Sequence, residues 1–294
     1  MADEIETQVE KPAPRRAKLG ADAKLIIKPI TQHQTQLFLL GETPLIYNAM
    51  SYKAKLGFLI PRGRMTEAQK RNSINKLRHN PEAEYRNSVY RHLDNEHATR
   101  LMFPAGAFKA ALVTAAGEQG IQMTSIQRHI WLKDSTVDIY GIPQLLMSIV
   151  RNAGINRTPD ERTRAILPEW ACTITVCFTD RLTEQQVVDL TSTAGMLIGI
   201  GDFRQEKGAG NYGQFRVTDL RDTKFKAIVE MGNREAQDAA LQIPCCYDAE
   251  TLSLMEAFKA EVQARGIEMP SLASDLLDDD PDMSLNGAEP NAEV

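Results

Sequence analysis

Residues 199–217, GIGDFRQEKGAGNYGQFRV, decide the fold because they connect a helical pattern to an alternating strand pattern. The residues before them, 183–198, open on the capping-box signature of Thr183 and Gln186 and place apolar residues on one helical face. The residues after them, GQFRVTDL (213–220), alternate in the manner of a half-exposed antiparallel strand. Five of the chain's 18 glycines lie in this segment, which predicts a mobile, glycine-rich connection between the two elements.

The glycine-rich segment does not match the common phosphate-binding loops. The dinucleotide pattern G-x-G-x-x-G fails because Arg204 occupies the third glycine position, and no G-K-[ST] occurs. A strand follows the segment, whereas a phosphate loop ends at a helix N-terminus. What remains is a backbone from which Arg204, Lys207 and Arg216 can approach a polyanion closely. A long surface turn without such a role explains the composition equally well.

Further patterns predict a fold of mixed sheet and helix. Extended chain is expected within residues 24–41, and ACTITVCF (171–178) is a strand by its β-branched content. Helices are expected at 105–117, at 143–152 before a basic loop, and at 248–266. The order of elements suits two β-α-β halves. The predicted fold class is α+β: a ferredoxin-like/RRM-like antiparallel sheet with helices on one face, a helical insertion lobe and disordered acidic termini.

Composition divides the chain into three parts. Residues 1–22 are predicted to be a flexible N-terminal arm, and residues 23–268 to be one nucleic-acid-binding domain. The insertion lobe of this domain lies at about 62–100, where the sequence is polar, rich in Asn and Arg, and split at Asn80-Pro81. Residues 269–294 are predicted to be an acidic disordered tail.

The net charge of −5 is an average over unlike segments. Residues 1–10 contain four acids and no base, and residues 271–294 contain seven acids and no base. The remaining 28 acids face all 34 bases, so the body of the chain carries about +6. A basic body with acidic ends predicts a polyanion partner for which the tail competes. The tail is expected either to dock replication or recombination proteins or merely to solubilise the chain.

Residues 53–78 combine the features of single-strand binding. Eight cations stand against Glu67 alone, and Tyr52 and Phe58 lie beside them as stacking platforms. Neutralised phosphates and stacked bases hold single strands without reading sequence. A solvated basic face is an equally weighted alternative. The eight cations are Lys53, Lys55, Arg62, Arg64, Lys70, Arg71, Lys76 and Arg78.

Two segments together resemble the RAMP superfamily, whose members form the crRNA-binding backbone and processing subunits of CRISPR effectors. FPAGAFKAAL (103–112) is similar to that family's I-P-G-S-S-L-K/R-G-x-L turn and helix, and residues 199–217 resemble its G-G-x-x-S-R-G-Y-G-R-V loop. This chain departs from the patterns at Ala105, Ala107 and Gln214. The resemblance implies a modified RRM-like fold and single-stranded RNA binding. Beyond the residues of 53–78, the nucleic-acid-binding prediction takes in Lys109, Arg162, Arg164, Arg204, Lys207 and Arg216, with Tyr212 as a further stacking residue.

Catalytic and metal-binding signals are weak in the sequence. Cys172 and Cys177 fall on opposite sides of a strand, and no second cysteine pair stands at zinc spacing from Cys245-Cys246. The five histidines form no constellation, and His92 and His97 are expected on a polar helix without a third ligand. The sequence therefore predicts no enzyme activity, no cofactor and no metal.

These observations lead to one functional prediction with two alternatives. The longest apolar runs fall far short of the roughly 18 residues of a membrane span, and four cysteines are too few for a disulfide scaffold, so a cytoplasmic location is expected. The predicted function is that of a multimeric, non-catalytic protein, of phage or mobile-element origin, that coats RNA or single-stranded DNA as a homo-oligomer or filament. The alternatives are a crRNA-binding backbone subunit of a CRISPR effector and an RNA-processing endoribonuclease.

Overall fold

The computed structural model describes residues 29–50, 55, 59, 79–151, 159–207 and 210–267. Residues 1–31 and 32–294 form two units, and the fold described here belongs to the second. The predicted arm at 1–22, the predicted tail at 269–294 and most of the basic stretch at 53–78 lie outside the described residues.

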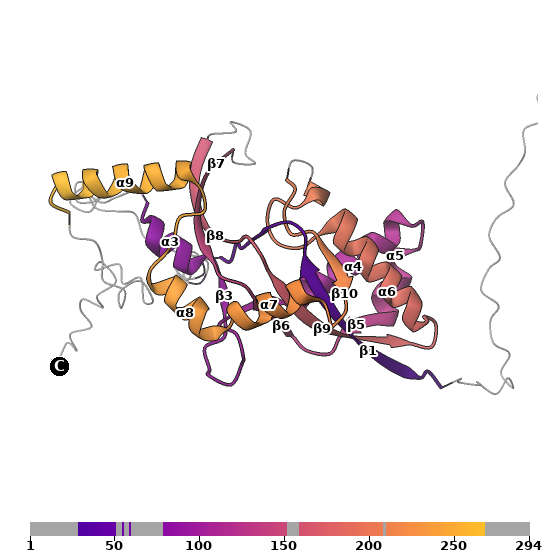
Figure 1. Ribbon diagram of the computed structural model, residues 1–294. Coiled ribbons are helices and arrows are strands. Elements are labelled where there is room, and N and C mark those ends of the chain that lie inside the picture. Colours follow the sequence, from indigo (N-terminus) through magenta and orange to yellow (C-terminus); the bar gives the residue numbers. More distant parts are fainter. Residues whose placement is uncertain are drawn as a thin grey trace, which may run out of the picture. The chain divides into compact units, whose positions relative to one another are not determined.

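The main sheet is antiparallel throughout its described pairings (Figure 1). Its strand order is β10-β1-β9-β6-β4-β3, and β5 pairs with the later half of β9. The α+β class with an antiparallel sheet is therefore confirmed. The strands are β1 (Gln32–Gly41), β3 (Tyr90–Arg91), β4 (Leu101–Pro104), β5 (Ile130–Leu132), β6 (Thr136–Tyr140), β9 (Ala171–Thr179) and β10 (Phe215–Thr218).

A layer of helices covers one face of this sheet. It consists of α4 (Ala105–Glu118), α5 (Met123–His129) and α6 (Glu184–Thr193), which continues as the π-helical turn Ala194–Ile198. Alternate residues of β1, Leu37 and Leu39, enter the core beneath this layer together with Phe108 of α4. The predicted capping box of α6 is present, with Gln186 N donating to Thr183 Oγ1 over 3.3 Å.

The opposite face of the sheet carries α7 (Thr223–Met231), followed by α8 (Arg234–Gln242). Phe225 and Ile228 of α7 pack against Leu40 of β1 and Ala171 of β9. The end of β1 is therefore buried on both sides, and α7 adds cover on a face that the sequence prediction had left without helices.

A second, three-stranded sheet is formed by β2 (Leu45–Ile46), β8 (Pro159–Leu167) and β7 (Gln144–Arg151). The predicted helix at 143–152 is wrong, because Gln144–Arg151 form a strand that pairs antiparallel with β8. Arg162 and Arg164, which were predicted in the basic loop after it, lie on β8. Apolar residues are so dense between Leu145 and Val150 that the 3.6-residue period of a helix and the two-residue period of a strand both fit them.

Two helices pack against the small sheet, α3 (Pro81–Asn87) and α9 (Ala249–Ala264), and α8 contacts α3. The buried hydroxyl of Tyr85 on α3 lies 3.1 Å from the carbonyl oxygen of Pro143 and 3.1 Å from that of Ala240, and either oxygen can accept its hydrogen bond. The predicted last helix is confirmed as α9, although Leu252, which was expected to face inward, is 49% exposed. Among the helices of the described residues, none is both long and apolar enough to cross a membrane.

The turn at 41–46 carries the chain from the main sheet to the small one. Gly41 N donates to Trp170 O over 2.8 Å, and Trp170 Nε1 donates to Thr43 O over 2.9 Å. Trp170 itself is fully buried. The turn is therefore fixed to β9 at the start of that strand, directly beside the glycine-rich segment.

Candidate nucleic-acid interface

The glycine-rich segment folds back on itself and is attached to the turn at 41–46. Ile200 N donates to Gly213 O over 3.0 Å, and Gly213 N donates to Pro44 O over 2.8 Å. Gly213 has a φ of +72°, and a Cβ there would lie 1.7 Å from the Ile200 carbonyl oxygen. No residue with a side chain fits this position. The described part of the segment is thus an ordered double bend, more tightly held than the mobile connection predicted from its glycine content.

Arg164 of β8 holds the middle of this bend through its contacts with Asp202 and Phe203. Its side chain is 3% exposed, forms an ion pair with Asp202 and donates to Ser148 Oγ over 2.8 Å. Its guanidinium carbon also lies 5.1 Å from the centroid of the Phe203 ring. Burial lowers the pKa of Arg164, and the neighbouring Asp202 carboxylate opposes this effect. Arg164 therefore supports the loop rather than presenting its full charge to solvent.

Three half-buried aromatic side chains lie beside Arg164 on one face of the small sheet. Phe203, Tyr212 and Tyr247 pack against an apolar patch formed by Ile46 of β2, Leu146 of β7 and Ile166 of β8. Burial is the main cause of a raised pKa at Tyr247, and the nearby Tyr212 adds to it. The rings are held by apolar contacts beneath them while part of each remains accessible, as base stacking requires.

Two further arginines adjoin these rings. Arg162 is exposed and lies two residues from Arg164 on β8, so both side chains project from the same face of the strand. The backbone of Arg204 bridges that of Tyr212. We call this surface the aromatic–arginine face. Its members are Arg162, Arg164, Phe203, Arg204, Tyr212 and Tyr247.

The other predicted cations of the described residues lie elsewhere. Arg216 of β10 projects from the sheet face that carries α7, where it contacts Asp222 at 2.6 Å and Glu42 at 3.4 Å. Lys109 is on α4, which covers the opposite face of the same sheet. Lys55 is exposed. The structure therefore brings together Arg162, Arg164, Arg204 and Tyr212, and it separates them from Lys109 and Arg216.

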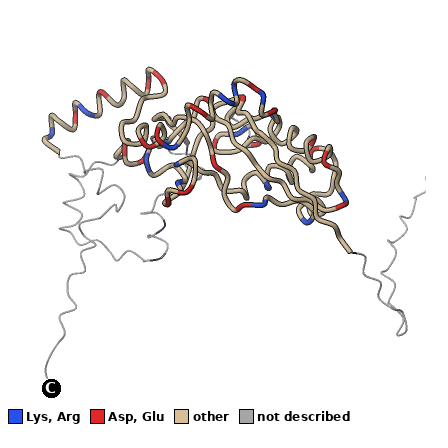
Figure 2. The backbone as a smooth tube through the Cα atoms, turned by 60° about the horizontal axis from the view of Figure 1, so that its bottom comes forward, with Lys and Arg blue, Asp and Glu red and all other residues tan. Residues whose placement is uncertain are grey.

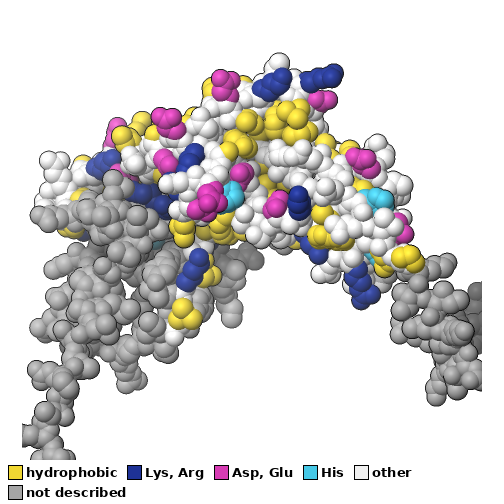
Figure 3. All heavy atoms as spheres, turned by 90° about the horizontal axis from the view of Figure 1, so that it is seen from below, with side chains coloured by type: hydrophobic (Ala, Val, Ile, Leu, Met, Phe, Trp, Pro, Cys, Tyr) yellow, Lys and Arg dark blue, Asp and Glu magenta, His cyan; other side chains and the backbone are white. Residues whose placement is uncertain are grey.

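The cations of the described residues are interleaved with acids. Lys and Arg alternate with Asp and Glu along the tube in Figure 2, and dark blue and magenta side chains stand close together on the face in Figure 3. Arg204 Nε contacts Glu206 Oε2 at 2.8 Å. The Arg216 contact is the largest cause of the lowered pKa of Asp222. Within the described residues, the predicted cations do not form one continuous basic trough.

The remaining predicted binding residues lie where the structure makes no statement about their side chains. They are Tyr52, Lys53, Phe58, Arg62, Arg64, Lys70, Arg71, Lys76, Arg78 and Lys207, and their role stays a prediction.

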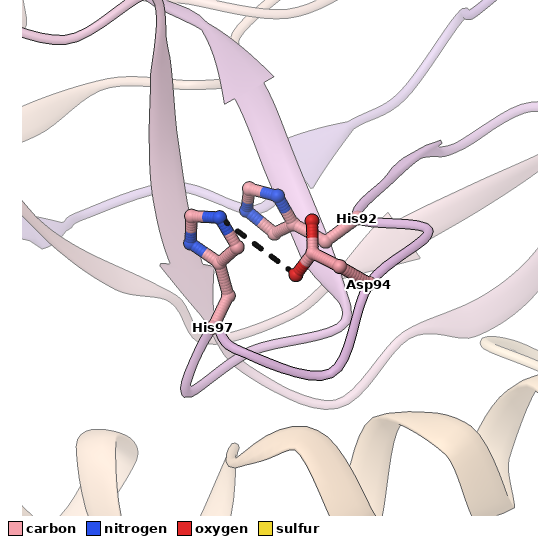
Figure 4. A group of neighbouring side chains, drawn as sticks. All are labelled: His92, Asp94 and His97. Atoms are coloured by element: carbon pink, nitrogen blue, oxygen red, sulfur yellow. Dashed lines mark ion pairs between the residues drawn. The ribbon is translucent and has the colours of Figure 1, made fainter.

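A second group of side chains gathers at the edge of the main sheet, and the sequence prediction missed it. His92, Asp94 and His97 lie on the loop after β3, with a possible ligand atom of each within 4.8 Å of the others (Figure 4). The expected helix is absent here, because β3 ends at Arg91 and the loop turns His97 back onto His92. Asp138 of β6 lies 2.8 Å from His92 Nε2 and 3.2 Å from His97 Nδ1. The closely spaced sequence HLDNEH (92–97) was the available signal.

This cluster borders a groove of about 660 Å³ on the α7 side of the main sheet. His97 and Asp138 belong to its lining, together with the hydroxyl-bearing side chains of Tyr140, Thr173 and Thr175. The groove is therefore a polar recess, unlike the apolar patch beneath the aromatic–arginine face.

No family model and no curated protein matches the sequence. Among solved structures, Cmr6 from Pyrococcus furiosus is similar at 9% identity and a TM-score of 0.33, over 64% of this chain and 99% of that one. The type III-B Cmr-beta complex bound to cognate target RNA is similar at 12% identity and a TM-score of 0.31, over 64% of this chain and 59% of that one.

Proposed function

We propose that this chain binds single-stranded nucleic acid without cleaving it and that the aromatic–arginine face is the contact surface. The supporting observation is the placement of Phe203, Tyr212 and Tyr247 over one apolar patch beside Arg162 and Arg164. Rings fixed by apolar contacts can stack on nucleotide bases, and the exposed guanidinium of Arg162 can contact a phosphate, while the buried Arg164 holds the Phe203 ring in place.

The order of the glycine-rich segment supports this proposal. Asp202 N donates to Ile46 O over 3.0 Å, and the Asp202 carboxylate is held by Arg164 and by Asn48 Nδ2 at 3.1 Å. Phe203 and Tyr212 are therefore positioned before any ligand arrives. Positioned rings lose little conformational entropy on binding, which favours affinity.

Assembly and biological setting belong to the same proposal. We favour a protein that coats RNA or single-stranded DNA in several copies, of phage or mobile-element origin. The alternative is that the chain is a crRNA-binding backbone subunit of a CRISPR effector. The RNA in the Cmr-beta structure belongs to that complex. It makes RNA the first polymer to test on this chain.

The decisive experiment measures binding of labelled oligo(U) and oligo(dT) to the full chain by fluorescence anisotropy over a series of salt concentrations. We expect the logarithm of the affinity to fall linearly with the logarithm of the salt concentration, with a slope of about −0.7 per phosphate contacted. Tyr212→Leu keeps the apolar contact with Ile46 but removes the stacking ring, so it should cost about 1–3 kcal/mol of binding free energy.

Two exposed arginines provide a matched comparison. Arg162→Gln should weaken binding and reduce the salt slope by about the contribution of one phosphate contact. Arg216→Gln should leave the affinity and the salt slope unchanged. Equal losses from the two variants would refute this contact surface. Cleavage of labelled RNA by the unmodified chain would refute the non-catalytic part of the proposal and favour the endoribonuclease alternative.

A further inference from the structure

We propose that His92, Asp94 and His97 bind a divalent transition-metal ion of the zinc class, with Asp138 as the carboxylate that positions the two imidazoles. The three residues come from one short loop, and their ligand atoms already lie within 4.8 Å of one another. Imidazole nitrogen and carboxylate oxygen are the ligands that zinc takes in sites with three protein ligands and one open position.

Asp138 sits where a supporting carboxylate is expected. One of its oxygens lies 2.8 Å from His92 Nε2 and 3.2 Å from His97 Nδ1. Each imidazole therefore uses one ring nitrogen toward Asp138 and keeps the other for an ion. Metal-binding histidines commonly donate their second nitrogen to a carboxylate in this way, which fixes the tautomer and the ring orientation.

The loop that carries the cluster is held in place by arginines from two directions. Arg234 of α8 donates to His97 O over 3.1 Å and to Asn95 Oδ1 over 2.8 Å. Arg100 donates to His92 O over 2.9 Å and pairs with Asp238 of α8. Backbone held at both ends is characteristic of a built site rather than of a chance meeting of surface side chains.

Ion binding requires two changes in the arrangement seen here, and the first concerns the stacked rings. The rings of His92 and His97 are stacked, with centroids 3.6 Å apart and planes within 9° of parallel. Two parallel rings cannot direct their in-plane lone pairs at one ion, so one ring must turn. His92 is 5% exposed and fixed, whereas the side chain of His97 is 40% exposed and has room to rotate.

Closing the site also requires the Asp94 carboxylate to move closer to the His97 imidazole. Its side chain is 52% exposed, and Asp94 Oδ1 lies 4.0 Å from His97 Nε2, the pair joined by the dashed line in Figure 4. Neighbouring ligand atoms on a zinc ion at 2.0–2.1 Å are roughly 3.3 Å apart. In the present orientation of His97, this distance therefore exceeds that spacing by less than about 1 Å. The open coordination position would adjoin the groove that His97 and Asp138 line.

The test uses the full chain, free of any affinity tag and stripped of metal with a chelator. Co²⁺ is titrated while its visible absorption is recorded, and Zn²⁺ is then added to displace it. We expect one ion per chain and the strong absorption of four-coordinate Co²⁺, lost when Zn²⁺ displaces it. A spectrum like that of the free hydrated ion would overturn the proposal.

Variants at exposed positions separate the ligands from general folding effects. His97→Gln and Asp94→Asn should each weaken Co²⁺ binding by at least about tenfold, and Asp138→Asn by about 10- to 100-fold. Asp134→Asn alters another acid that lines the same groove and should bind as the unmodified chain does. Thermal unfolding without metal should be similar for all four variants. Unchanged Co²⁺ binding in His97→Gln and Asp94→Asn would refute the site.

Asp138 needs a readout of its own, because we assign it a positioning role. If Asp138 orients the imidazoles, Asp138→Asn should weaken Co²⁺ binding and alter the Co²⁺ absorption band. The unfolding temperature of the metal-free chain should stay unchanged. A lower unfolding temperature with unaltered affinity would show that Asp138 is only a structural partner of His92.

Discussion

At the scale of single residues, charge in the sequence does not reveal which cations are available. Arg164 and Arg204 were both predicted to meet phosphate, yet each has a carboxylate partner, Asp202 and Glu206. Sequence separation hides the first of these pairs, because the partners are 38 positions apart in the chain. Tyr212 was singled out from its place in the glycine-rich segment, whereas Phe203 and Tyr247 were not, and the stacking role of Tyr212 stays a prediction.

The pair of Arg164 and Asp202 leads to a prediction about stability. Asp202→Asn leaves a guanidinium that is 3% exposed without its counter-charge, whereas Arg164→Met leaves a carboxylate that is 31% exposed and can be hydrated. Removing one partner of a fully buried pair costs about 3–5 kcal/mol, and the partial exposure of Asp202 reduces this to about 2 kcal/mol for Asp202→Asn. Arg164→Met should cost less, as measured by urea unfolding. A larger loss for Arg164→Met would contradict this account.

At the scale of elements, local signals predicted those segments whose side chains alternate or repeat cleanly. The capping box of Thr183 and Gln186 predicted the start of α6, and Asp248 predicted the start of α9. Thr251 N donates to Asp248 Oδ1 over 2.7 Å. Helices α7 and α8 were missed although Asp222 and Asn233 cap them. The hairpin β7–β8 was missed because it is apolar on both faces, one face entering the main core and the other the patch beneath the aromatic rings.

Helix α7 provides a prediction for this scale. Phe225 is 4% exposed, packs on Leu40 and Ala171, and meets the ring of Phe38 edge-on at 5.6 Å. Phe225→Ala should destabilise the chain by about 3 kcal/mol, since it opens a cavity between the helix and the sheet. Lys226→Ala, one residue further on the exposed side, should change the unfolding free energy by less than about 0.5 kcal/mol. Similar losses for the two variants in thermal or urea unfolding would mean that α7 does not cover the sheet as described.

At the scale of the whole molecule, the α+β class and the antiparallel sheet followed from the order of patterns along the chain. The second sheet did not, because a two-residue strand such as β2 (Leu45–Ile46) leaves no periodic signal. Arg216 also lies apart from the aromatic–arginine face, since strand alternation sends Arg216 and Phe215 to opposite sides of β10. The basic stretch at 53–78 remains a prediction.

The uneven distribution of charge leads to a prediction for the full chain. The seven acids of residues 271–294 should compete with nucleic acid for the basic body of the protein. Deleting these residues should therefore tighten oligonucleotide binding several-fold at low salt, and the gain should vanish at high salt because exposed charges are then screened. A chain whose seven acids are replaced by Asn and Gln serves as the control for length and should show the same gain. Unchanged affinity in both variants would assign the tail to solubility alone.

The turn at 41–46 joins three parts of the protein that would otherwise be independent. It continues β1, it receives the Trp170 indole, and it accepts the amide of Gly213 at Pro44 O. Glu42 N in turn donates to Gln214 O over 2.9 Å. A displacement of the bend would therefore also strain the turn at 41–46, which connects the two sheets. The hydrogen bonds made by Thr43 and Pro44 to Trp170, Gly213 and Gln214 would oppose such a displacement.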